Sequence, residues 1–206
     1  MSSSIDLELS EGWRSPPGIF IIAEVDGAVG ARIRAIQQAY DPKLARSLPP
    51  HVTIAGSSGV GPISAETTVA ELRERLEPIC ASTPALELPL QAPHRFMQTD
   101  IVVLPLDPHG ALRELHERIA GCGLRFGRAK FAFTPHVTLS FYRTLEPSTT
   151  RELLAQRIDE PVQITHIRCS LTNEPMPPRT LLELSLGGGD GEGARAASPT
   201  VRPVPS

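Results

Sequence analysis

Two periodicities of apolar residues divide most of this chain into short strands and helices. Apolar positions that recur every three or four residues predict helices, and short β-branched runs predict strands. Over the first half, the pattern predicts a strand at 18–25, a helix, a strand at 51–56, a helix and a strand at 85–90. The helices carry two apolar stripes, formed by Val29, Ile33, Ile36 and Tyr40 and by Val69, Leu72, Leu76 and Ile79.

The second half repeats this order. The pattern predicts a strand at 101–106, a helix, a strand at 136–142, a second helix, and closing strands at 162–171 and 181–186. The apolar stripes of these helices are Leu112, Leu115 and Ile119 and then Leu153, Leu154 and Ile158. Both halves therefore contain a strand-helix-strand-helix-strand unit, which indicates an internal duplication.

Three helix starts are marked by side chains that can cap the free N–H groups of a first turn. Thr68 and Thr149 each precede a glutamate by three positions, which is the pattern of a capping box. Asp107 followed by Pro108 predicts the start of a third helix, the one that carries Leu112, Leu115 and Ile119.

The two ends of the chain differ from this core. Residues 1–17 are polar and irregular, and residues 187–206 are rich in Gly, Pro, Ala and Ser. Such segments bury too little apolar surface to offset the entropy of ordering. We therefore expect a flexible N-terminal segment at 1–17 and a disordered C-terminal tail at 187–206. Between them we expect a single bilobal domain over 18–186, with lobes at about 18–96 and 97–186 that can exchange strands.

Composition narrows the classes of function. The 206 residues fit one domain, and the net charge of −3 argues against an extended nucleic-acid surface. No apolar stretch is long enough to span a membrane and the start lacks the order of a secretory signal, so we expect a cytoplasmic monomer. Cys80, Cys122 and Cys169 are odd in number and widely spaced, which predicts buried thiols instead of disulfides or a zinc site.

A four-residue motif, Pro-His-Val-Thr, occurs in both halves. It stands in PPHVTIAG at 49–56 and in TPHVTLSF at 134–141, and each copy begins the second strand of its half. Side chains alternate along a strand, so His51 and Thr53 share one face, as do His136 and Thr138. If a pseudo-two-fold axis relates the halves, the two faces can line opposite walls of one cleft.

Two imidazoles and two hydroxyls around one centre suit the hydrolysis of a phosphodiester. One histidine can act as a base toward water while its partner, held protonated near the phosphate, protonates the leaving oxygen. The threonine hydroxyls can hydrogen-bond the non-bridging oxygens. This chemistry needs no metal, and no histidine pair among His94, His109, His116 and His166 has the context of a metal site.

The paired H-x-T-aliphatic motifs resemble those of the 2H phosphoesterase superfamily, in particular its bacterial 2′-5′ RNA ligase-like branch. The resemblance covers about 18–186, and His51-Val52-Thr53-Ile54 and His136-Val137-Thr138-Leu139 match at every defining position. It implies a bilobal α+β fold, with antiparallel sheets lining a central cleft and helices outside. It also implies cofactor-free hydrolysis of 2′,3′-cyclic phosphates of nucleotides or RNA ends to 2′-phosphates, reversible 2′-5′ RNA ligation, and His136 as base with His51 as acid.

Two alternatives stay open at this point. The same site could act on the cyclic phosphate of ADP-ribose or on a 2′-5′ linked oligonucleotide. A nucleotide-binding module could also hold a phosphate between the motifs without turnover.

Three further residues are candidates for substrate binding. Phe133, in the cationic and aromatic segment 125–133, could stack on a base or belong to the core. Tyr142 shares the face of His136 and Thr138, whereas Arg143 reaches a phosphate only if the strand bulges or ends before it. His94 and Phe96 share one face of an extended segment and could approach the motifs, although a surface position is favoured.

Overall fold

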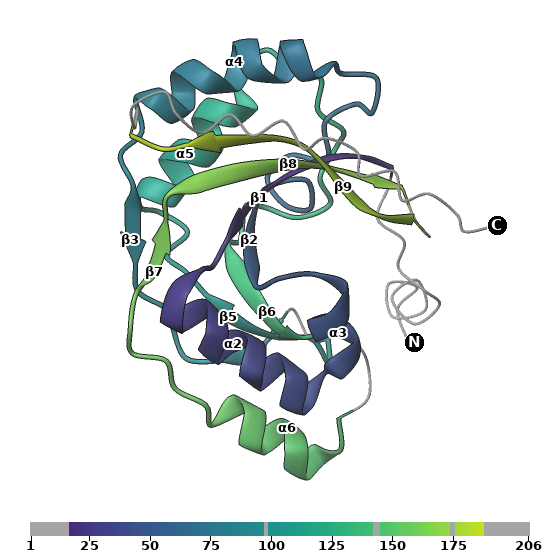
Figure 1. Cartoon of the computed structure of the whole chain (residues 1–206). Coiled ribbons are helices and arrows are strands. Elements are labelled where there is room, and N and C mark those ends of the chain that lie inside the picture. The colour runs from purple at the N-terminus through teal and green to yellow at the C-terminus, as the bar shows by residue number, and fades with distance from the viewer. Residues whose placement is uncertain (1–16, 97–98, 142–144, 174–175, 188–206) are drawn as a thin grey trace, which may run out of the picture.

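The strands form one large antiparallel sheet and one small one (Figure 1). The computed structural model describes residues 17–96, 99–141, 145–173 and 176–187. The large sheet has the order β4-β5-β6-β2-β1-β8-β9, and β3 pairs with β7. The bounds are β1 (Gly18–Glu24), β2 (His51–Ala55), β3 (Leu86–Leu88), β4 (His94–Arg95), β5 (Val102–Pro105), β6 (His136–Ser140), β7 (Val162–Ile164), β8 (His166–Asn173) and β9 (Met176–Ser185).

The helices complete an α+β fold in which the predicted repeat is present. The helices are α2 (Gly27–Tyr40), α3 (Pro42–Ser47), α4 (Val69–Ala81), α5 (Ala111–Ala120) and α6 (Pro147–Leu154). The first unit is β1-α2-β2-α4-β3, with α3 as a short addition, and the second is β5-α5-β6-α6-β7. The strands β4, β8 and β9 stand outside the repeat and extend the large sheet on both sides.

The duplication extends to the register of the strands. Ala23 pairs with Val52 in the first unit, and Leu104 pairs with Val137 in the second. The two units join where β2 pairs with β6 at Val52 and Val137. Their third strands, β3 and β7, pair with each other in the same antiparallel sense. A pseudo-two-fold axis through both junctions accounts for this arrangement.

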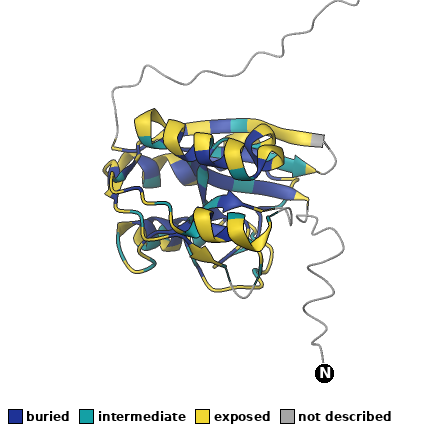
Figure 2. Cartoon of the chain, turned by 90° about the horizontal axis from the view of Figure 1, so that it is seen from below, coloured by how far each residue is buried: buried dark blue, intermediate teal, exposed yellow. Residues whose placement is uncertain are grey.

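Each side of the molecule combines one helix from each half of the sequence. Figure 1 shows α4 and α5 together on one side of the strands and α2 and α6 on the other, and both pairs of helices are in contact. α5 also packs on β2, and α2 packs on β6, so each of these helices covers the strand of the other half. Figure 2 shows the buried residues concentrated in the strands between these helices. The spatial sides are therefore not the contiguous halves of the chain.

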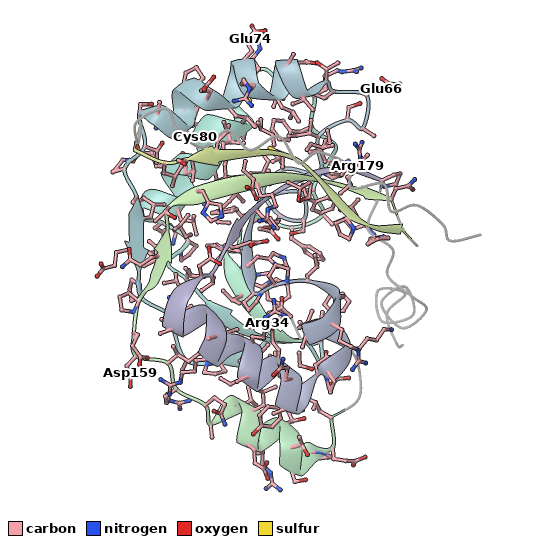
Figure 3. The ribbon with its side chains drawn as sticks, viewed as in Figure 1. Arg34, Glu66, Glu74, Cys80, Asp159 and Arg179 are labelled. Atoms are coloured by element: carbon pink, nitrogen blue, oxygen red, sulfur yellow. The ribbon has the colours of Figure 1, made fainter. Side chains whose placement is uncertain are left out.

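The core contains most of the predicted stripes and two of the three thiols. Cys80 and Cys169 are buried, and burial raises the pKa of each thiol to about 12. Figure 3 shows Cys80 on the inner side of α4 and Glu74 on its outer side. Cys122 is partly buried and also free. Val69 is exposed because it stands at the first position of α4, so its place in the predicted stripe is wrong.

Three local predictions differ from the structure. The strand expected at 162–171 is broken at Thr165, because β7 belongs to the small sheet and β8 to the large one. The capping box at Thr149 is not formed, because α6 begins at Pro147, whose fixed φ favours the first helical position, with Glu146 as N-cap. α5 begins at Ala111, because the carboxylate of Asp107 accepts a hydrogen bond from His109 N–H and closes a turn before the helix.

The described ranges contain no helix that is both long and apolar enough to cross a bilayer.

The two T-x-x-E patterns give a matched test of helix capping. Thr68 Oγ1 accepts a hydrogen bond from Glu71 N–H at 3.2 Å, whereas Thr149 lies inside α6. Thr68→Ala should lower the free energy of unfolding by about 1 kcal/mol, and Thr149→Ala should change it by less than about 0.5 kcal/mol. Urea unfolding followed by circular dichroism measures both changes. Equal losses in the two variants would contradict the assignment of the caps.

Candidate functional site

The two motifs meet at the junction of the two repeats. β2 and β6 are antiparallel and pair at Val52 and Val137, so His51 lies across from Thr138 and Thr53 lies across from His136. Side chains that face each other across such a pair have their Cβ atoms about 5 Å apart. His51, Thr53, His136 and Thr138, here called the motif cluster, therefore occupy the four corners of one small patch.

Strand alternation orients the cluster as the sequence predicts. Val52 and Val137 are fully buried, and the histidines and threonines on either side of them are half-buried. The position of the cluster differs from the expectation in one respect. The motifs lie side by side on neighbouring strands of one sheet, where the sequence led us to expect facing walls of a cleft.

Each imidazole is held by the backbone two residues before it. His51 Nδ1 lies 2.8 Å from the carbonyl oxygen of Pro49, and His136 Nδ1 lies 2.7 Å from that of Thr134. A carbonyl oxygen can only accept, so Nδ1 carries the proton and donates it in both rings. The Nε2 atom of each ring is left with its lone pair when the ring is neutral, and can gain and lose a proton.

Both histidines favour their neutral form. Burial lowers the pKa of His51, and the hydrogen bond to Pro49 opposes this effect only in part. Burial is also the main cause that lowers the pKa of His136, and the charges of His51 and His94 lower it further. The charge of His51 thus acts on His136, as expected for side chains at opposite corners of one small patch.

The flanks of the cluster break the pseudo-symmetry. His94 pairs with Val103, which pairs with Thr138, and Arg168 pairs with Ile22, which pairs with Thr53. His94 and Arg168, on strands outside the repeat, therefore flank the two repeats at equivalent positions. Pairing partners share a face, so both lie on the face of the motif cluster.

These equivalent positions have different environments. Arg168 donates hydrogen bonds to the carboxylate of Glu24 and, at 2.6 Å, to that of Glu183. Glu24 pairs with His51 in the register, and burial raises the pKa of its carboxyl although the charge of Arg168 opposes the shift. His94 is exposed. The carboxylates of Glu24 and Glu183 therefore compensate the charge of Arg168. The charge of His94 instead contributes to the lowered pKa of His136.

An aromatic ring also distinguishes the second repeat. The ring of Phe96 lies beside the imidazole of His136, with centroids 4.7 Å apart and an angle of 40° between the planes. The sequence placed His94 and Phe96 on one face and favoured a surface position. His94 is exposed as expected, whereas the ring of Phe96 reaches His136. Glu24 and Arg168 were missed altogether. Their signal was a single carboxylate at the end of the apolar strand Gly18–Glu24 and a single guanidinium within the strand His166–Asn173.

Of the three residues predicted to bind substrate, the structure describes only Phe133. Phe133 is 6% exposed and its ring stacks on His116, with centroids 3.9 Å apart and planes 12° apart. This position leaves little of the ring to stack on a base and favours the core alternative. Tyr142 and Arg143 lie outside the described residues. Phe131, two residues before Phe133, is exposed instead of continuing the core.

Within the ranges that the structure describes, no three His, Cys, Asp or Glu side chains come together in a group that could hold a metal ion.

Known proteins with a similar sequence are phosphoesterase-like. Residues 25–173 match the family model of the 2′-5′ RNA ligase superfamily. Over 94 residues the chain is 31% identical to the "Putative phosphoesterase" of Geobacillus kaustophilus and 32% identical to that of Geobacillus thermodenitrificans. Each match covers 45% of this chain and 51% of the relative, so the chain spans about half the length of the curated relatives it matches.

Solved structures confirm the fold. The crystal structure of a phosphoesterase is similar with a TM-score of 0.50 and 17% identity, covering 83% of this chain and 98% of that chain. E. coli LigT in its apo form is similar with a TM-score of 0.51 and 19% identity, covering 84% and 99%.

The lowered pKa values of the two histidines predict how stability depends on pH. In the unfolded chain each histidine titrates near pH 6.5, and in the folded chain its pKa is lower. Between these values the unfolded state binds more protons, so the stabilising effect of the neutral rings is present above pH 6.5 and is lost as pH falls through the folded pKa.

The double variant His51→Asn, His136→Asn separates this effect from other titrations. Asn keeps a donor near the position of Nδ1 but does not titrate. Urea unfolding at pH 7.5 and pH 5 should show a smaller loss of stability in the variant than in the wild type. Parallel losses would contradict the lowered pKa values.

Proposed function

The chain belongs to the 2′-5′ RNA ligase superfamily, and from this premise we propose that it is a metal-independent phosphodiesterase that hydrolyses 2′,3′-cyclic phosphates of nucleotides or RNA ends to 2′-phosphates. The observation that carries the proposal is the register of β2 and β6. It puts the two histidines on one diagonal of the motif cluster and the two threonines on the other.

The diagonal arrangement fits an in-line displacement at phosphorus. A phosphate centred over the cluster has an imidazole on each of two opposite sides, where the attacking and leaving oxygens lie. The hydroxyls of Thr53 and Thr138 then face the two non-bridging oxygens and can donate hydrogen bonds to them. Either threonine lies directly across from the histidine of the other motif, so both repeats contribute to each side of the phosphate.

The reaction follows from the free Nε2 atoms. Neutral Nε2 of one histidine accepts a proton from water as the water oxygen bonds to phosphorus. The bond between phosphorus and the 3′ oxygen breaks, and the Nε2–H of the other histidine donates its proton to that oxygen. The product is a 2′-phosphate with a free 3′-hydroxyl. The same steps, with an RNA 5′-hydroxyl in place of water, would form a 2′-5′ linkage, because that hydroxyl attacks the cyclic phosphate and the 3′ oxygen leaves with the proton of the acid.

The surroundings support His136 as the base and His51 as the acid. Burial disfavours the protonated form of both histidines, and the charge of His94 adds to this effect at His136, which matches the state that a base requires. The phosphate of a bound substrate is negative and raises the pKa of the histidine that must donate. When substrate is bound, the phosphate would stabilise the protonated ring of His51. The Nε2–H of that ring could then protonate the leaving oxygen.

An assay in EDTA tests the function. Wild-type protein should convert 2′,3′-cyclic nucleotides to 2′-nucleotides, and His51→Ala and His136→Ala should each lower kcat/KM by about 10²- to 10⁴-fold. The exposed Val69→Ala serves as a control that should keep its activity. Product that persists in both histidine variants would overturn the mechanism. Binding without product in the wild type would indicate a binding module. Loss of wild-type activity in EDTA would indicate a metal. ADP-ribose cyclic phosphate and 2′-5′ linked dinucleotides, assayed in parallel, compare the alternative substrates.

A pH profile separates the roles of the two histidines. The rising limb of kcat/KM reports the base, and the falling limb reports the acid. The residual activity of His136→Ala should lose the rising limb, and that of His51→Ala should lose the falling limb. The opposite pattern would exchange the two assignments while leaving the two-histidine mechanism in place.

A further inference from the structure

A bulge follows the threonine of each motif. Ile21 pairs with Ala55 and Ile22 with Thr53, so Ile54 has no partner on β1. In the second repeat, Val102 pairs with Ser140 and Val103 with Thr138, so Leu139 has no partner on β5. The bulges stand at equivalent positions. A bulge disrupts the ladder of hydrogen bonds locally and can redirect neighbouring side chains, which here are the motif threonines.

Each bulge receives a hydrogen bond from a helix of the other half. His116 Nδ1 on α5 lies 2.7 Å from the carbonyl oxygen of Ile54, and Gln37 Nε2 on α2 lies 2.8 Å from that of Thr138. His116 is 5% exposed and Gln37 is 2% exposed. Each is the one polar side chain among the buried residues of its helix.

Stability alone does not account for these residues. Oε1 of Gln37 is buried and accepts no hydrogen bond from the part of the chain that is described. An unpaired buried polar atom costs about 1–3 kcal/mol, which an apolar side chain of similar size would avoid. His116 is enclosed between the ring of Phe133 and the backbone of Gly59, whose φ of +72° and lack of a Cβ make room for Nε2. Both side chains are thus fixed in one orientation toward the motif strand.

We propose that Gln37 and His116 are positioning residues for the two motif threonines: each bonds the backbone at a bulge and thereby holds Thr138 or Thr53 against the phosphate. The inference rests on the proposed function and deepens it. The bulges interrupt the ladder of hydrogen bonds beside the threonines, and small displacements of groups that contact a transition state lower the rate strongly. Because each helix comes from the other half, folding of either half fixes the threonine of its partner.

Matched substitutions separate positioning from packing. His116→Asn keeps a donor near the position of Nδ1, whereas His116→Leu removes it. His116→Leu should lower kcat/KM for 2′,3′-cyclic nucleotides about tenfold, and His116→Asn should restore most of the loss. Gln37→Leu should lower kcat/KM by a similar factor. Ile119→Val, a buried change on α5 without a bond to the motif strand, should leave kcat/KM near the wild-type value.

Double-mutant cycles show whether each residue acts through its threonine. In a Thr53→Val background, His116→Leu should have less than about a threefold effect, and Gln37→Leu should likewise lose its effect in a Thr138→Val background. If the factors by which the two substitutions lower kcat/KM simply multiply in both double variants, the proposal is overturned. A His116→Asn variant no more active than His116→Leu would overturn it as well.

Phosphate binding keeps this test independent of turnover. Calorimetric titration of inorganic phosphate through the same cycles should show the same coupling, because the threonine hydroxyls hold phosphate oxygens. Coupling in phosphate binding without turnover in the wild type would refute the proposed function and support the positioning role. Turnover with no coupling in either measurement would refute the positioning role alone.

Discussion

The antiparallel pairing of Val52 with Val137 determines the geometry of the motif cluster. Because side chains alternate along a strand, burying these two valines turns the histidine and threonine of each motif to the other face. Because the strands are antiparallel and the motifs identical, the same pair sets each histidine across from the threonine of the other copy. A slip of one residue would bury one imidazole and expose a valine, so the hydrophobic core of the sheet opposes it.

Much of this arrangement could be predicted from local patterns, and the rest depends on contacts that no local pattern contains. Strand alternation placed His51 and Thr53 on one face, and Thr68 caps its helix as its sequence indicates. The same T-x-x-E pattern failed at Thr149 because Pro147 starts the helix earlier. The pairing of Arg168 with Glu24, 144 residues apart, depends on β8 joining β1 across the whole fold, which periodicity does not reveal.

The crossing of helices between the halves joins the two repeats into one unit. α5 packs on β2 and α2 packs on β6, so neither motif strand is covered only by helices of its own half. The small sheet adds a second link, in which Gln163 Nε2 donates to the carboxylate of Glu87 at 2.7 Å between the third strands of the two repeats. Each motif strand is therefore packed by residues from both halves of the chain.

Two identical motifs can perform different roles only if their surroundings differ. The catalytic proposal requires one imidazole to accept a proton and the other to donate one, and perfect symmetry would give both the same pKa. The large sheet removes the symmetry at its edges, where β4 stands beside β5 and the β8–β9 hairpin stands beside β1. His94 and Phe96 come from the first of these edges and act on His136, while Glu24 and Glu183 match the charge of Arg168 at the second. The strands added outside the repeat therefore supply part of the difference. The repeat supplies another part, because Glu24 pairs with His51 where Pro105 pairs with His136.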